Sequence, residues 1–181
     1  KKELELLEAA LIKHSGANAL LVGEPGSGKK TILAELAARI RRGQAFPALE
    51  NKRVMMLAAS AVTGSGKTKG ETESLLLTIL NEANHAGNVI LAIDDFPEFV
   101  SSLSALGIST GQIFAPFLTS SSLHLIALAD TAPFRRIIAS DAGLLASFET
   151  IYLGDLDRAR ISEILEDEAS AYERAQSGKI I

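Results

Sequence analysis

A glycine-rich loop near the N-terminus constrains this chain more than any other feature. It reads Gly23-Glu24-Pro25-Gly26-Ser27-Gly28-Lys29. The run 19–22 before it is wholly apolar, as in a buried strand, and segment 29–41 after it carries apolar residues at helical spacing. Glycines at this spacing between a strand and a helix let consecutive backbone N–H groups turn inward around phosphates. We therefore predict a strand, loop and helix unit that holds phosphate.

The residues after the loop alter the usual chemistry of such a site. Lys29 would reach the β- and γ-phosphates of a nucleotide. The motif normally continues with Ser or Thr, whose hydroxyl binds Mg²⁺, but here Lys30 follows and the hydroxyl comes at Thr31. One residue is about 100° of helix rotation, so Thr31 should point away from the metal. The predicted ligand is ATP or ADP. A bound Mg²⁺ is doubtful, because the hydroxyl that would bind it is replaced at Lys30.

A second glycine-rich stretch, Gly64-Ser65-Gly66-Lys67-Thr68, imitates the first between a predicted strand and a predicted helix. The motif would need its first glycine at position 61, which is Ala61. Because a side chain there would disturb the tight turn, we expect this stretch to bind no phosphate.

Acidic residues end a later strand. The apolar run 89–93, within the strand expected at 88–93, is followed by Asp94 and Asp95. A buried strand that ends in acids can direct one carboxylate to the metal region and a second to the attacking water, although such a pair can also be a solvated turn. Downstream of the glycine-rich loop, we favour the nucleotide-site interpretation.

Short apolar strands alternate with amphipathic helices along the chain. We predict an α/β fold of the P-loop NTPase type, with a central, mainly parallel, five-stranded sheet flanked by helices. Its strands are expected at 19–22, 53–58, 88–93, 123–128 and 148–153. Helices are expected at 3–14, 29–41, 71–84, 110–118, from Pro133 and at 158–173. Residues 1–157 form one nucleotide-binding unit, and 158–181 are a helix that leads out of it.

Composition excludes several classes of protein. With 181 residues, 47% of them apolar, the chain can bury a core. The net charge of −4 and the lack of a basic stripe disfavour nucleic acid as a partner. No apolar run approaches the about 20 residues of a membrane span, so we expect no membrane partner.

Cysteine and histidine give no metal site. The absence of cysteine excludes disulfides and thiolate ligands and fits a reducing compartment, so we expect a cytoplasmic protein. His14, His85 and His124 share no ligand spacing, and we expect each at the surface or a strand edge. Because the chain begins at Lys1 and ends in polar, helix-like sequence, we interpret it as part of a longer protein.

These motifs together resemble the first ATPase module of the Clp/ClpB-type AAA+ unfoldases and disaggregases, over nearly the whole chain. The resemblance rests on the entry strand and GEPG loop (18–26), the connection to the next strand (43–54), the pore-loop position (67–71) and the Walker B strand (88–95). It implies the large α/β subdomain of an AAA+ module, with 158–181 leading towards a lid subdomain. The implied partners are other AAA+ subunits in a hexameric ring and protein clients.

The resemblance also implies roles for individual residues. The positions at which this sequence differs from the family are those that carry out catalysis. The implied catalytic residues are Asp95, which is shorter than the family's Glu, and Asp130, at the position of a neutral sensor residue. Ala146 and Ser147 stand where two arginine fingers are expected, and such a finger is worth about 10³ to 10⁵ in rate. The implied nucleotide-binding residues are Glu24, Pro25, Gly26, Ser27, Gly28, Lys29, Lys30, Thr31 and Asp94.

Three functional hypotheses remain. The first is a nucleotide-binding but hydrolytically weak AAA+ module that acts as a scaffold or regulator in a Clp-like chaperone. The second is an active ATPase that drives protein unfolding in a ring, with Asp95 as base and cations from a partner chain. The third, an adaptor that serves DNA replication, is disfavoured by the lack of a basic surface pattern.

Lys30 leads to one further expectation. An unpaired ammonium or two unpaired carboxylates would be costly in a partly desolvated cleft. We therefore expect Lys30 to pair with Asp94 or Asp130 in the metal's place, the alternative being a side chain extended into solvent. Nucleotide binding should then depend little on Mg²⁺, and ADP should be preferred because Asp130 adds negative charge near the γ-phosphate.

Overall fold

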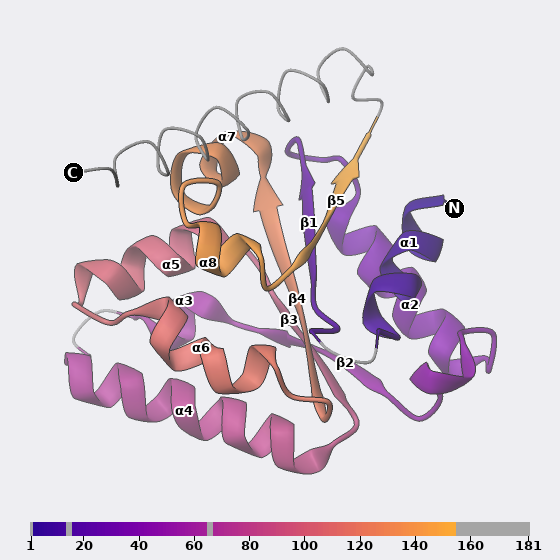
Figure 1. The fold of residues 1–181 in the computed structure, drawn as a ribbon, viewed down its shortest axis with the longest axis horizontal. Helices are drawn as coiled ribbons and strands as arrows, with labels where there is room; N and C mark the ends of the chain where they lie inside the picture. Colours follow the sequence, from indigo (N-terminus) through magenta and orange to yellow (C-terminus); the bar gives the residue numbers. More distant parts are fainter. Residues whose placement is uncertain (1, 14–15, 65–66, 155–181) are drawn as a thin grey trace, which may run out of the picture.

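A five-stranded, all-parallel sheet forms the centre of the molecule in the computed structural model, which describes residues 2–13, 16–64 and 67–154 (Figure 1). The strand order is β2-β3-β4-β1-β5, so β4 and β1 are both internal. The predicted fold class is confirmed. The strands are β1 (Ala19–Gly23), β2 (Arg53–Leu57), β3 (Val89–Ile93), β4 (Leu123–Asp130) and β5 (Glu149–Leu153).

Helices cover both faces of this sheet, with α1 and α2 on one side and α4, α5 and α6 on the other (Figure 1). No helix among the described residues is long and apolar enough to cross a membrane. The longer helices are α1 (Lys2–Leu11), α2 (Lys29–Arg41), α4 (Lys69–Ala86), α5 (Phe96–Ala105) and α6 (Thr110–Leu118). The short ones are η1 (Pro47–Leu49), α3 (Ala59–Val62), α7 (Thr131–Pro133), the π-helical turn η2 (Phe134–Ile138) and α8 (Ala142–Leu145).

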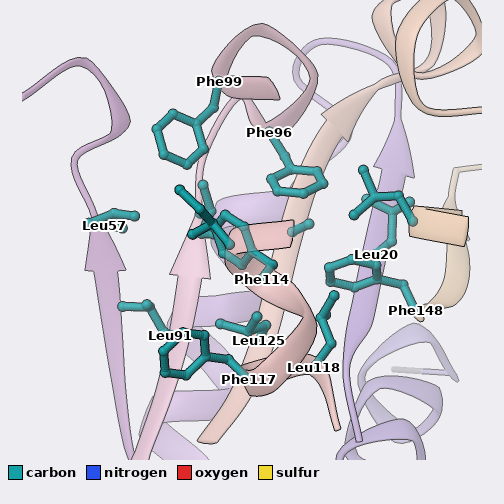
Figure 2. Packing of buried hydrophobic residues seen from close by; sticks show 14 of the residues in the cluster. Leu20, Leu57, Leu91, Phe96, Phe99, Phe114, Phe117, Leu118, Leu125 and Phe148 are labelled. Atoms are coloured by element: carbon teal, nitrogen blue, oxygen red, sulfur yellow. The ribbon is translucent and has the colours of Figure 1, made fainter. Parts of the chain in front are cut away.

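Alternate residues of each internal strand pack into two separate cores, as the two-residue period of a strand requires. In β1, Leu20 and Val22 belong to the larger core, whereas Ala19 and Leu21 belong to the smaller core under α1 and α2. The larger core is rich in phenylalanine, and part of it is shown in Figure 2. Both cores hold the internal strands rigidly and so fix the positions of the residues that follow them.

Some expectations from the sequence differ from the structure or lie outside the described residues. Helix α5 was not predicted at all. The helix expected to open at Pro133 begins earlier, at Thr131. His124 is wrong as a surface or strand-edge residue, because β4 is internal and the side chain is buried; desolvation lowers its pKa. The predicted helix 158–173 and His14 lie outside the described residues.

Candidate nucleotide site

The candidate site lies where the carboxyl ends of three neighbouring strands meet. All strands are parallel, so the ends of β1, β3 and β4 share one edge of the sheet. Gly23, the last residue of β1, is in register with Asp130, the last residue of β4. Asp94 directly follows β3. This is the edge at which open parallel sheets bind ligands.

Backbone geometry explains the glycines of the loop. Gly26 and Gly28 have φ angles of 79° and 90°, which side-chain-bearing residues rarely adopt. A Cβ on Gly23 would lie 2.5 Å from the Ser27 hydroxyl oxygen, so a side chain at this position would force the hydroxyl to move. The Ser27 N–H donates to the Glu24 carbonyl at 3.0 Å and closes the turn. Lys29 is thereby held at the start of α2.

The N-terminus of α2 is open to an anion. Its N-cap residue is Gly28, which makes no side-chain capping bond, and the first turn contains no acidic residue. The first N–H groups of a helix have no partner within the helix, and the helix dipole favours negative charge beside them. Together with the glycine-rich loop, this is the usual construction of a phosphate site.

Lys29 is surrounded by oxygen atoms. Its ammonium donates to the carbonyl oxygens of Gly23 and Glu24 at 2.9 and 3.0 Å and contacts the Ser27 hydroxyl at 3.4 Å. It also forms an ion pair with Asp130, with 2.6 Å between Nζ and Oδ1. Only 12% of the Lys29 side chain is exposed. The lysine is thus anchored by the loop and by the end of β4.

Lys30 forms the second ion pair of the site. Its Nζ lies 2.5 Å from Oδ2 of Asp94, and this contact raises the pKa of Lys30. Its side chain remains 70% exposed, so the ammonium reaches Asp94 across the surface of the hollow rather than through the core. The expected pairing of Lys30 with one of two acids is confirmed, and Asp94 is the partner.

These side chains surround a hollow of about 420 Å³. All of its lining residues are among those predicted: Pro25, Gly26, Gly28, Lys29, Lys30, Thr31, Asp94, Asp95 and Asp130. The other two predicted residues contact Lys29 from within the loop, Glu24 through its carbonyl and Ser27 through its hydroxyl. The structure therefore brings the whole predicted set together.

Sequence reasoning missed a larger neighbouring hollow of about 870 Å³. It lies between α1 and α2 and shares Thr31 with the first hollow. Its other lining residues are Leu4, Glu5, Ile32, Glu35, Arg39 and Gln44. These positions have no motif in common, and only the packing of the two helices brings them together.

The second glycine-rich stretch differs from its predicted setting. It follows the short helix α3 rather than a strand, which corrects the expectation of a strand-to-helix frame. The Lys67 ammonium donates to the Ala61 carbonyl, and Thr68 forms a capping box with Glu71 at the start of α4. Its described polar groups therefore serve local turns and a helix cap.

Asp95 occupies an unusual conformation at the edge of the first hollow. Its φ of 45° and ψ of 46° are left-handed, which is rare for a residue other than glycine. Burial and the nearby charges of Asp94 and Asp130 raise the pKa of Asp95, and Lys30 opposes them. The ionised carboxylate is consequently disfavoured in the folded chain.

Replacing Asp95 by Asn should raise the melting temperature at pH 7. A carboxyl with a raised folded pKa lowers stability once the pH exceeds its unfolded value, so removing the charge relieves this penalty. Asn also tolerates the left-handed conformation. In melting curves recorded at several pH values, the gain should shrink as the pH falls from the raised folded pKa towards the unfolded value, and it should vanish below about 4, where Asp95 is protonated in both states. A gain that is constant with pH would instead reflect backbone strain alone.

A parallel α/β sheet with a glycine-rich loop after β1 defines a P-loop nucleotide-binding domain. Residues 19–127, more than half of the chain, match the family described as "ATPase family associated with various cellular activities (AAA)". The chain belongs to this AAA family.

Clp-type proteins are among its relatives. It is 34% identical to the chaperone protein ClpB of Wolinella succinogenes over 85% of this chain and 18% of that protein. It is 33% identical to ClpC, an ATP-binding subunit of the ATP-dependent Clp protease, from Staphylococcus epidermidis over 95% of this chain and 21% of that protein. The chain thus spans about a fifth of the length of these relatives.

A solved structure shares the fold. The closed-state cryo-EM reconstruction of Hsp104 with ATPγS and FITC casein matches with a TM-score of 0.72. The match covers 96% of this chain and 30% of that chain, at 23% sequence identity. The arrangement of strands and helices is therefore the same as in the matching part of that chain.

Proposed function

We propose that this chain is a nucleotide-binding, hydrolytically weak AAA+ module that acts as a scaffold or regulator within a longer Clp-like chaperone. The main support is the pair of contacts Lys29–Asp130 and Lys30–Asp94, which neutralise the centre of the site from within. Residues 1–157 would form the large α/β subdomain, and 158–181 would lead towards a lid subdomain. Other AAA+ subunits in a ring, and protein clients, are the proposed partners.

The two hollows suit the two ends of a nucleotide. Phosphates would accept hydrogen bonds from the loop and from the uncapped N-terminus of α2. Lys29 would share its ammonium between Asp130 and a phosphate. The larger hollow, which begins at Thr31, has room for the nucleoside. Because ATP and ADP share these groups, both are proposed ligands.

Weak hydrolysis is supported by the residues at the catalytic positions. Asp95 is held in a strained turn, and its carboxylate is one methylene shorter than a glutamate. Asp130 carries a negative charge where a phosphate would have to approach, and it already binds Lys29. Ala146 and Ser147 offer no cation to a neighbouring subunit. The site can thus hold phosphate without strongly stabilising the charge that develops during its transfer.

We expect this chain to release phosphate from ATP at well below about one turnover per second, which is the low end for kinases. Asp95→Glu alone should leave the rate unchanged, because it supplies neither a metal ligand nor a finger. The measurement is steady-state phosphate release, with Lys29→Ala as the matched background. Turnover at or above that rate that disappears in Lys29→Ala would establish the active ATPase instead.

One observation favours that active ATPase as the second candidate. The pKa of Asp95 is raised, and a general base works best when its pKa approaches the operating pH. In this alternative a partner subunit supplies the missing cations. Phosphate release by the full-length oligomer, compared with this chain alone, distinguishes the two candidates.

A further inference from the structure

The Lys30–Asp94 ion pair occupies the part of the site that a divalent metal would need. If the loop holds a nucleotide, as proposed above, a resident Mg²⁺ would require oxygen ligands near the last phosphates. Asp94 is the acid that follows β3 and faces the loop, and Lys30 Nζ already lies 2.5 Å from its Oδ2. A cation is therefore built into the chain at this position.

The remaining groups do not fit Mg²⁺. The hydroxyl that would complete its coordination is replaced by an ammonium at position 30, which has three donors and no acceptor. Thr31 borders the hollow but is exposed and turned by about 100° along the helix. The donor set suits an ammonium rather than a divalent metal.

The charges that line the hollow also favour the Lys30 ammonium as the cation beside Asp94. Its lining carries two ammoniums, Lys29 and Lys30, and three carboxylates, Asp94, Asp95 and Asp130. Each lysine pairs with a different acid, so the positive charges are spread over both sides of the hollow. Without Lys30, Asp94 would face a phosphate as an unpaired carboxylate, which is strongly unfavourable in a partly desolvated site.

We propose that the Lys30 ammonium is the site's permanent cation, bridging Asp94 to a bound diphosphate, so that the chain binds ADP without Mg²⁺. Asp130 then sets the preference for ADP. Its carboxylate lies beside Lys29, next to the end of β1, and would repel a third phosphate. The inference depends on the proposed nucleotide site, but it makes a separate claim about the metal.

Isothermal titration calorimetry of the full chain with ADP and with ATP, in EDTA and in excess Mg²⁺, tests this directly. We expect ADP to bind more tightly than ATP, and we expect Mg²⁺ to change ADP affinity by less than about threefold, which is less than half the worth of one charge-assisted contact. Tighter ATP, or a tenfold or larger gain from Mg²⁺, would overturn the inference and leave the nucleotide site standing. If neither nucleotide binds in either condition, the proposed function fails as well.

Lys30→Thr supplies the sharper comparison, because it restores a hydroxyl and removes the ammonium. Affinity for ADP in EDTA should fall by about 10- to 100-fold, the worth of one charge-assisted contact, and Mg²⁺ should recover most of the loss. The matched control is Lys67→Thr in the other glycine-rich stretch, which should behave as the unchanged chain. Equal ADP affinity in EDTA for Lys30→Thr and the unchanged chain would show that the ammonium contributes nothing.

Asp130→Asn tests the second half of the proposal. The substitution keeps the shape of the side chain but removes the charge that faces the third phosphate. ATP affinity should rise towards that of ADP, while the small effect of Mg²⁺ on ADP should persist. An unchanged ratio of ATP to ADP affinity would remove Asp130 from the explanation.

Discussion

Lys29→Ala should lower nucleotide affinity by about 100-fold or more, the equivalent of two charge-assisted contacts. The ammonium of Lys29 contacts three oxygens of its own loop and the carboxylate of Asp130, which places it at the centre of the candidate phosphate site. Its removal takes away the cation and leaves Asp130 unpaired, so attraction is replaced by repulsion. Calorimetric titration with ADP measures the loss.

Two variants separate this effect from a general loss of positive charge. Lys67→Ala removes a lysine from the other glycine-rich stretch and should leave the affinity unchanged. Adding Asp130→Asn to Lys29→Ala should recover part of the binding, because it removes the unpaired carboxylate. Undiminished affinity in Lys29→Ala would mean that the loop is not where phosphate binds.

Phe96→Ala should destabilise the chain by about 3–5 kcal/mol, the usual cost of removing a buried aromatic side chain. The Phe96 ring is fully buried and lies edge-on to Phe114, with 6.3 Å between ring centroids. The centroid of its ring lies 5.6 Å from that of Phe148. Figure 2 labels all three phenylalanines in the same part of the core. Because native domains are stable by only about 5–15 kcal/mol, the loss is a large fraction of the total. Urea unfolding followed by circular dichroism gives the value.

Phe46→Ala is the matched control, because the same substitution then falls on a side chain that is 43% exposed. Its effect should stay within about 0.5 kcal/mol. Similar unfolding midpoints for the two variants would show that the phenylalanine core does not carry the stability expected of it. Phe96 also follows Asp95 directly, so its variant should loosen the turn that ends in the candidate site.

The sheet was predictable because its internal strands are buried on both faces. Such strands are nearly continuous apolar runs: segments 19–22 and 89–93 are wholly apolar, and 123–128 is interrupted only by His124. Helix α5 was missed because its start, Phe96-Pro97, follows two acids and looks like the end of a turn. Proline in the first helical turn, with apolar residues at helical spacing behind it, was the available signal.

The sequence predicted which residues line the candidate site, but not which lysine pairs with which acid. The loop and Asp94–Asp95 are recognisable as motifs, whereas the assignment of each lysine to its acid depends on strand order. Asp130 meets Lys29 because β4 lies directly beside β1, and this strand order could not be predicted from the sequence. The resemblance to Clp-type modules identified Asp130 as a site residue, and the register of β1 and β4 explains why it reaches the loop.

Burial of the Glu8 carboxylate was also missed, although its place in an apolar stretch of sequence was a signal for it. Glu8 lies on the apolar face of α1, between leucines at helical spacing, and is 1% exposed. Its carboxylate pairs with Arg39 of α2 at 3.2 Å, and burial raises the pKa of Glu8 while Arg39 lowers it. A charge within an apolar stripe predicts such a partner, but only the packing of α1 against α2 identifies it.

The uncapped start of α2 would make the stability of the fold depend on the nucleotide concentration around it. A helix that lacks a capping side chain at its first turn is incomplete, and a phosphate bound there would supply the missing acceptors. Because the nucleotide would bind only the folded domain, it would raise the free energy of unfolding. The increase is about 2.7 kcal/mol when the nucleotide concentration is a hundred times the dissociation constant. Such a module would be most resistant to unfolding in a nucleotide-rich cell and would become fragile when the nucleotide pool is depleted.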